Sequence, residues 1–293
     1  MQVKKMGSRG ILFNLPSKPF SVQIYCINTP NYLFIIDSGV VLENQMEDVK
    51  KYLKENNLLT KPVIIFNTHS HLDHIAGNGV IDSRLIIGQE LSLEGFQNTF
   101  DLLNKYGDYK IAAENLIFPN LTFSKKLVFE TEDIEFFHTP GHTEDSASCY
   151  DRLDKILLVG DSLVSPLPSI NWYQLDIFIE TLQKYKEIEF NKMILAHEIV
   201  LEDTKFIDES IEYIKRFKAL DVDFTGFTDT HALMYRWGLV NIAKNLKKDG
   251  EEEEAKKFFL KAKTDIKNPI IKPEDESEYK QIIELIDKGL KSQ

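Results

Sequence analysis

A short apolar run that leads directly into a cluster of histidines constrains this chain more than any other feature. Residues 61–68, Lys-Pro-Val-Ile-Ile-Phe-Asn-Thr, are short, apolar and opened by a proline, which predicts a buried strand. The next six positions contain four side chains able to bind a metal: His69, His71, Asp73 and His74. An α/β protein places its chemistry at strand ends of this kind.

The clustering favours a metal site over a structural role for these histidines. A single histidine near a strand end is usually structural, but this chain has only 7 histidines in all. Three of them within six positions are therefore unlike a chance arrangement. Imidazole and carboxylate ligands together suit zinc, iron or manganese. We take a metal site as the first hypothesis.

Later predicted strands also end on a histidine or an aspartate. The strands expected at 134–138, 156–159 and 192–196 are followed by His142, Asp161 and His197. Ligands drawn from several strand ends are assembled into one pocket at one edge of a sheet sandwich.

The remaining pattern predicts a strand-rich region and then a helical tail. Strands at 11–15, 20–27 and 32–37 predict an antiparallel meander, and helices are expected at 44–57, 174–188 and 204–220. After a linker, further helices are expected at 231–248, 251–266 and 277–290. We therefore expect a catalytic domain over residues 1–220 and a helical extension over residues 221–293.

The motifs together resemble the metallo-β-lactamase-fold superfamily of metal-dependent hydrolases. The family pattern is His-x-His-x-Asp-His, then a lone His, a bridging Asp and a last His, and this chain matches it throughout. The resemblance covers roughly residues 10 to 220. It implies an α/β (α+β) fold, a four-layer αββα sandwich, here with a C-terminal α-helical extension. One departure is Glu198 after the last histidine, because many relatives have a glycine beside it.

The resemblance also implies a role for each matched residue. The first metal site would be formed by His69, His71 and His142, the second by Asp73, His74 and His197, with Asp161 bridging the two ions. Two divalent ions, zinc by preference with iron or manganese as alternatives, can share a hydroxide that attacks an ester, thioester or lactone of a small molecule. Asp73 is expected to orient this nucleophile and to pass a proton to the leaving group.

Other activities on the same fold remain open. A phosphodiesterase or nuclease is disfavoured because the formal net charge is −11 and no basic stripe lies near the motifs. An iron-dependent oxidoreductase is a further alternative. A non-catalytic scaffold that acts through the helical tail is disfavoured by the complete ligand set. A lactone substrate is disfavoured because no tyrosine directly follows Asp161, where lactonases of the family tend to have one.

Two adjacent aromatics in the loop after Asp161 form a candidate substrate wall. Trp172 and Tyr173 could line the pocket, or they could pack within a surface loop. Cys26 and Cys149 lie in apolar runs and are expected to be small buried core residues.

The tail and the surface composition suggest partners and location. The helices at 231–248 and 251–266 are similar to one tetratricopeptide-like hairpin, too little to form a solenoid. They are expected to pack on the first domain, to close over the pocket or to form a homodimer contact. The first twenty residues have no continuous apolar segment and no run approaches 18 apolar residues, so we expect no signal peptide, no membrane partner and a cytoplasmic protein.

Overall fold

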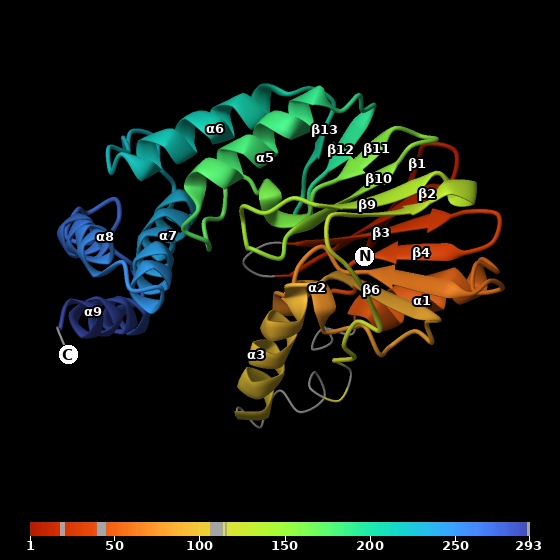
Figure 1. Ribbon diagram of the computed structural model, residues 1–293, viewed down its shortest axis with the longest axis horizontal. Helices are drawn as coiled ribbons and strands as arrows, with labels where there is room; N and C mark the ends of the chain where they lie inside the picture. Colours follow the sequence, from red (N-terminus) through yellow and green to blue (C-terminus); the bar gives the residue numbers. More distant parts are fainter. Residues whose placement is uncertain (18–20, 40–44, 106–113, 115, 292–293) are drawn as a thin grey trace. The chain divides into compact units, whose positions relative to one another are not determined.

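The strands form two mixed sheets in the computed structural model, which describes residues 1–17, 21–39, 45–105, 114 and 116–291 (Figure 1). Sheet A has the order β1 (Gln2–Met6), β2 (Gly10–Leu15), β3 (Val22–Asn28), β4 (Leu33–Ile36), β5 (Val63–Phe66), β6 (Leu85–Gln89) and β7 (Leu121–Phe123). Sheet B has the order β13 (Val200–Leu201), β12 (Lys192–Ile194), β11 (Ile156–Leu158), β10 (Ala147–Asp151), β9 (Ile134–His138) and β8 (Lys126–Phe129).

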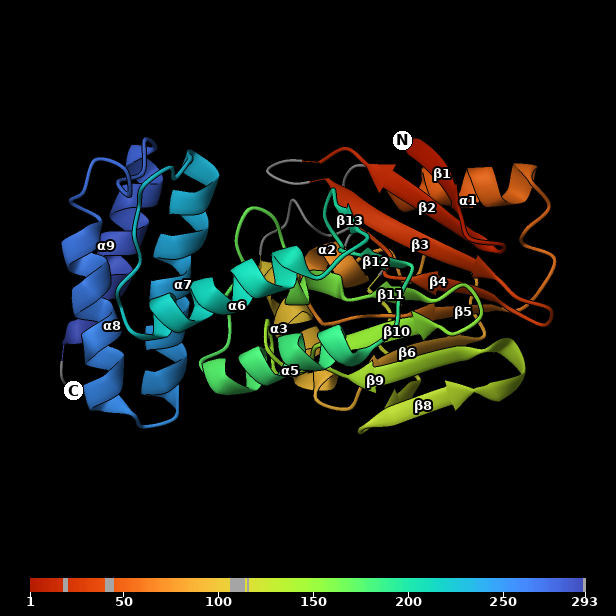
Figure 2. The same ribbon diagram turned by 90° about the horizontal axis from the view of Figure 1, so that it is seen from above.

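The predicted antiparallel meander at the start of the chain is confirmed. Strands β2, β3 and β4 lie side by side, with Phe13 opposite Ile24 and Cys26 opposite Ile35 (Figure 2). Phe20 and Asn44, at the starts of a predicted strand and a predicted helix, lie outside the described residues. Strand β1 was not predicted, because it is a polar strand with two lysines at the sheet edge, where charge discourages further pairing.

The two sheets enclose an apolar core. Strand β5 is buried on both faces, which explains its continuous apolar run. Ile64 and Phe66 point between the sheets, where the rings of Phe66 and Phe136 stack with centroids 4.1 Å apart. Val63 and Ile65 pack on the opposite face with apolar residues of α1 (Gln45–Glu55). The core therefore fixes the end of β5, where the histidine cluster begins.

Strand directions bring the candidate site residues to one edge of each sheet. Strands β4, β5 and β6 are parallel, so their carboxyl ends share an edge of sheet A. Strands β11 and β12 are likewise parallel in sheet B. A backbone hydrogen bond of 2.7 Å from the N–H of Ala147 to the carbonyl of Thr68 joins the two sheets beside this edge.

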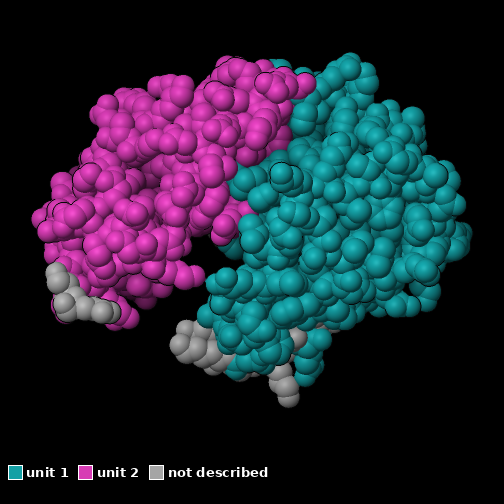
Figure 3. All heavy atoms as spheres, viewed as in Figure 1, with its two compact units in different colours: residues 1–140, 145–161, 188–203 teal, residues 141–144, 162–187, 204–293 magenta. Residues whose placement is uncertain are grey.

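The chain divides into two compact units (Figure 3). Unit 1 comprises Met1–Pro140, Asp145–Asp161 and Ile188–Asp203, and unit 2 comprises Gly141–Glu144, Ser162–Glu187 and Thr204–Gln293. Unit 1 contains both sheets with α1, α2 (Leu72–Ile75) and α3 (Ser92–Lys105). The expected domain boundary at residue 220 stays a prediction.

Unit 2 is helical, and the predicted tail helices are confirmed within a few residues. Its helices are α5 (Leu175–Glu187), α6 (Lys205–Lys218), α7 (Asp229–Lys248), α8 (Glu252–Asp265) and α9 (Glu276–Leu290). Gly250, at φ +84°, makes the turn between α7 and α8 in a conformation that a residue with a Cβ rarely adopts. None of the described helices is long and apolar enough to cross a membrane.

Candidate metal centre

The histidine cluster is held in a loop whose two ends are tied together. Nδ2 of Asn67 donates to Oδ1 of Asn78 at 3.0 Å, and Nδ2 of Asn78 donates back to Oδ1 of Asn67 at 2.9 Å. Asn67 also donates to the carbonyl of His74 at 3.0 Å. Both amides are buried, so this reciprocal pair fixes the loop that presents the metal-binding side chains.

One group of ligand atoms is formed by Asp73, His74 and His197, whose candidate atoms lie within 4.8 Å of one another. Oδ2 of Asp73 lies 3.6 Å from Nε2 of His74 and 3.6 Å from Nε2 of His197. Two ligands of one tetrahedral zinc ion, each bonded at about 2.0–2.1 Å, stand about 3.3 Å apart. The observed separations therefore suit a shared ion.

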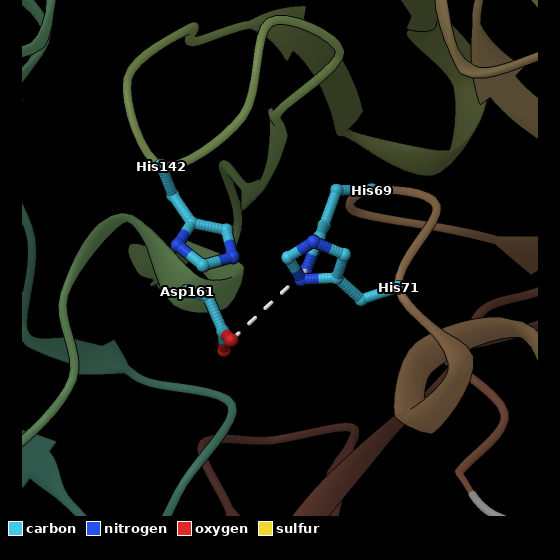
Figure 4. Close-up of side chains that lie close together, drawn as sticks. All are labelled: His69, His71, His142 and Asp161. Carbon is cyan, nitrogen blue, oxygen red and sulfur yellow. Dashed lines mark hydrogen bonds and ion pairs between the residues drawn. The ribbon is translucent and has the colours of Figure 1, made fainter. Parts of the chain in front are cut away.

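A second group consists of His69, His71, His142 and Asp161, again with ligand atoms within 4.8 Å of one another. Figure 4 shows their imidazoles and carboxylate turned toward one another. Nε2 of His69 lies 3.0 Å from Nδ1 of His71 and 3.9 Å from Oδ2 of Asp161. All seven predicted ligands thus fall into these two groups.

Asp161 stands between the groups. Its Oδ2 faces His69, whereas its Oδ1 lies 3.6 Å from Nε2 of His74 and 3.2 Å from Nε2 of His197. The preceding Gly160 has φ +54°, and a Cβ there would lie 2.7 Å from Oγ1 of Thr68. Only glycine fits this close approach, which places the aspartate at the junction.

Three of the histidines are oriented through Nδ1. The backbone carbonyl of Ser21 lies 2.7 Å from Nδ1 of His197, and the carbonyl of Ser169 lies 2.8 Å from Nδ1 of His142. A carbonyl only accepts, so in both rings Nδ1 carries the proton and Nε2 is the nitrogen that could bind a metal.

Asp37, which directly follows β4, orients the third histidine, His74. Its Oδ2 lies 2.8 Å from Nδ1 of His74 and accepts from the hydroxyl of Thr68 at 2.9 Å, while its Oδ1 accepts from the backbone N–H of Thr68 at 2.8 Å. The sequence pattern identifies Asp37 only as the end of a predicted strand. Its position beside the carboxyl end of β5 is the signal that identifies it.

The electrostatics of the cluster favour positive charge at its centre. Burial acts to lower the pKa of His197, but the Asp161 carboxylate raises the pKa to about 9. Burial acts to raise the pKa of Asp161, yet His197 and His74 hold that pKa well below its usual range. Metal cations can take the place of protons bound in such a cluster.

His74 shows directly that the residues suit a metal. Its Nε2 is buried and has no hydrogen-bond partner among the described residues, although the carboxylates of Asp73 and Asp161 lie 3.6 Å away. Leaving a buried polar atom in this state is costly unless an ion occupies the centre. The donor set of imidazoles and carboxylates is one that zinc accepts.

The departure from the family motif has a structural consequence. Glu198, which follows the last histidine, has φ +54°, in the left-handed region that favours glycine. Its carboxylate accepts from the backbone N–H of Ser21 at 3.4 Å.

The proposed substrate wall stays a prediction. Trp172 and Tyr173 are half-buried, and their rings contact each other edge-on with centroids 6.3 Å apart. A hydrogen bond with Asp249, at the end of α7, raises the pKa of Tyr173. These contacts hold the two aromatics against each other and Tyr173 against the end of α7, and they do not bear on a substrate.

The chain belongs to the metallo-beta-lactamase superfamily. The model of that family matches residues 17–197, more than half of the chain. The solved DIM-1 metallo-beta-lactamase is 17% identical, with a TM-score of 0.56 over 73% of this chain and 96% of that one. A metallo-beta-lactamase family protein from Thermus thermophilus is 18% identical, with a TM-score of 0.58 over 72% and 81%. The predicted αββα sandwich with a helical extension is confirmed.

Curated proteins with similar sequences include two that are named as hydroxyacylglutathione hydrolases. An uncharacterized protein of Aquifex aeolicus is 30% identical over 132 residues, which are 44% of this chain and 58% of that protein. A hydroxyacylglutathione hydrolase of Pelagibacter ubique is 25% identical over 213 residues, 68% of this chain and 80% of that protein. A probable hydroxyacylglutathione hydrolase of Encephalitozoon cuniculi is 27% identical over 144 residues, 48% of this chain and 49% of that protein. The family match and the His/Asp cluster together suggest that the chain binds divalent metal.

Proposed function

We propose that the protein is a hydrolase with two zinc ions that cleaves an ester, thioester or lactone of a small molecule. The observation behind this proposal is the position of Asp161, whose two carboxylate oxygens face two different groups of ligand atoms. A carboxylate in this position could bridge two metal ions, one bound by each group. His69, His71 and His142 would complete one site, and Asp73, His74 and His197 the other.

The chemistry follows from this arrangement. Divalent ions bound here supply Lewis acidity and lower the pKa of water from 15.7 to about 7. The chain holds the ligand nitrogens in one tautomer through Asp37, Ser21 and Ser169, so that no reorientation is needed during reaction.

Asp73 is the member of the set suited to proton transfer. Its side chain is 36% exposed, whereas that of Asp161 is 9% exposed. An accessible carboxylate beside the reacting atoms can orient a water molecule through one oxygen and then deliver a proton to the leaving group. We therefore assign this role to Asp73.

Among carbonyl substrates we favour a thioester. Two relatives have names that specify hydroxyacylglutathione, an acylated thiol, and one of them aligns over 68% of this chain. A thiol leaving group needs little help from a general acid, which suits a site whose accessible acid is a single aspartate. The net charge of −11 disfavours polyanionic phosphodiesters.

The test is a substrate panel with matched thioester, aryl ester, lactone and phosphodiester compounds, each with and without a chelator. We expect chelator-sensitive thioester hydrolysis that returns on adding zinc and is lost in Asp161→Ala. Asp82→Asn, at an exposed aspartate, is the matched control and should behave as wild type. Turnover of the phosphodiester alone would favour the nuclease alternative. No hydrolysis by a protein that binds iron would favour the oxidoreductase.

A further inference from the structure

The loop that follows Asp161 is fastened to α7 by two asparagines of that helix. Nδ2 of Asn241 donates to Oδ1 of Asn171 at 2.5 Å, and Nδ2 of Asn245 donates to the backbone carbonyl of Asn171 at 2.8 Å. The two helical residues are four positions apart and project from the same face. Together they hold both the side chain and the backbone of a single loop residue.

Asn171 lies next to the group that orients His142. Its Nδ2 donates to Oγ of Ser169 at 3.1 Å, and the carbonyl of the same serine lies 2.8 Å from Nδ1 of His142. Nδ2 of Asn171 is also 3.5 Å from that Nδ1, at the outer limit of hydrogen-bond distance. The Nδ1 proton of His142 points to the Ser169 carbonyl, so Nδ1 does not accept a hydrogen bond from Asn171. The Asn171 amide is instead a packing contact that limits rotation of the imidazole.

The packing around this loop leaves little room for movement. A Cβ added at Gly238 of α7 would lie 3.2 Å from the ring of Phe217 in α6 and, at ordinary contact distance, 3.6 Å from Cβ of the buried Ile170. A Cβ added at Gly141, next to His142, would lie 2.2 Å from the ring of Phe178 in α5. Gly141 therefore allows the backbone beside His142 to approach α5 closely, and Ile170 of the loop packs against α7. The loop and His142 therefore pack against α5 and α7, helices that begin only after residue 174 in the chain.

We propose that Asn171, Asn241 and Asn245 are positioning residues for His142, so that the helical tail is part of the support of the metal centre. None of the three touches reacting atoms. They act through the Ser169 carbonyl, which sets the tautomer and direction of the imidazole. The inference rests on the proposed function in one respect, the role of His142 as a metal ligand.

The test measures zinc binding separately from activity. Zinc is titrated against a chromogenic chelator in the presence of wild type, Asn171→Ala or the double variant Asn241→Ala/Asn245→Ala. The control is Lys244→Ala, at an exposed residue of the same helix. Partners that orient a metal-binding histidine typically contribute about 10- to 100-fold in affinity. We expect the asparagine variants to lose about 10-fold or more for one zinc ion and to bind the other as wild type does.

A second readout follows the imidazole itself. Long-range ¹H–¹⁵N spectra of the zinc-loaded protein should show His142 with its proton on Nδ1 in wild type and in Lys244→Ala, and a mixture of tautomers in the asparagine variants. If the double variant does not fold, Asn241→Ala alone keeps the bond from Asn245 and serves the same purpose.

The outcomes separate this inference from the proposed function. Selective loss of one zinc ion in the asparagine variants supports the positioning role. Wild-type affinity for both ions in these variants, or an equal loss of both, overturns it and leaves the hydrolase proposal in place. A wild-type protein that binds no zinc overturns both.

Discussion

Oδ2 of Asp37 lies 2.8 Å from Nδ1 of His74, and this contact joins the end of β4 to the histidine cluster after β5. Both side chains are buried, and Asp37 accepts two further hydrogen bonds from Thr68. A carboxylate in this position fixes the ring and increases the basicity of the nitrogen that faces the metal.

Replacing Asp37 with Asn should weaken zinc binding by about 10- to 100-fold, because the ring loses its anionic partner. Asp37 has φ +61°, a conformation that Asn tolerates, so the backbone should be unaffected. Chelator competition measures the affinity. Asp133→Asn is the matched control, since Asp133 also has positive φ, at 53°, and lies outside the site. Equal affinities in the two variants would contradict the role of Asp37.

The stack between the sheets should dominate the stability of unit 1. Phe136 is fully buried and stacks on Phe66 with centroids 4.1 Å apart. Phe136→Ala should lower the free energy of unfolding by about 3–5 kcal/mol, as expected for a large cavity in a packed core. Leu153→Ala, at a side chain that is 58% exposed, should change it by less than about 0.5 kcal/mol. Urea denaturation compares the two, and similar midpoints would argue against this core.

The two cysteines should be unreactive in the folded protein. Cys26 and Cys149 are free thiols with no exposed surface, and burial raises the pKa of each. Because the thiolate is the reactive form, a disulfide reagent should label neither in native buffer and both in guanidinium. Rapid labelling of the native protein would mean that β3 or β10 opens readily.

Glu278 should link α9 to α7. It accepts from Nε and Nη2 of Arg236 at 2.9 and 2.7 Å and from Nε1 of Trp237 at 2.8 Å. Glu278→Ala leaves a guanidinium with 9% side-chain exposure without its carboxylate. The cost should be about 2–3 kcal/mol, below that of a fully buried pair because Glu278 is 20% exposed.

Tryptophan fluorescence during urea unfolding reports on this link directly. Glu278→Gln keeps an acceptor for Trp237 and should cost less than the alanine variant. Lys280→Ala, at an exposed residue of the same helix, should be neutral. An alanine variant as stable as the lysine control would show that the carboxylate contributes little.

The candidate ligands could be predicted from the sequence because each is a chemically distinctive side chain at or just after a predicted strand end. His69, His71, Asp73 and His74 are local in sequence, and the strands before His142, Asp161 and His197 have clear apolar patterns. Their assembly in one pocket was expected because they follow several strand ends of a sheet sandwich, and their division between two metal sites was implied by the resemblance to the superfamily.

The groups that orient the ligands could not be found in the same way. Asp37 acquires its role from the parallel pairing of β4 with β5, which no local pattern encodes. The carbonyls of Ser21 and Ser169 are backbone groups that any residue could supply. The link from Asn171 to Asn241 joins positions 70 residues apart.

Element predictions failed where polar or very short segments form strands. Strand β1 is mostly exposed and has two lysines, and β13 has only two residues. Both are recognised only through their neighbours, β2 and β12.

A zinc titration of the metal-stripped protein tests the central claim most directly. Wild type should bind two equivalents of zinc per chain, and thioester hydrolysis should appear only as zinc is added. Asp161→Asn, which removes the charge between the two groups of ligands, should bind fewer than two and lose hydrolysis. Full hydrolysis by the stripped protein, or two tightly bound equivalents in Asp161→Asn, would contradict a centre in which Asp161 bridges two ions.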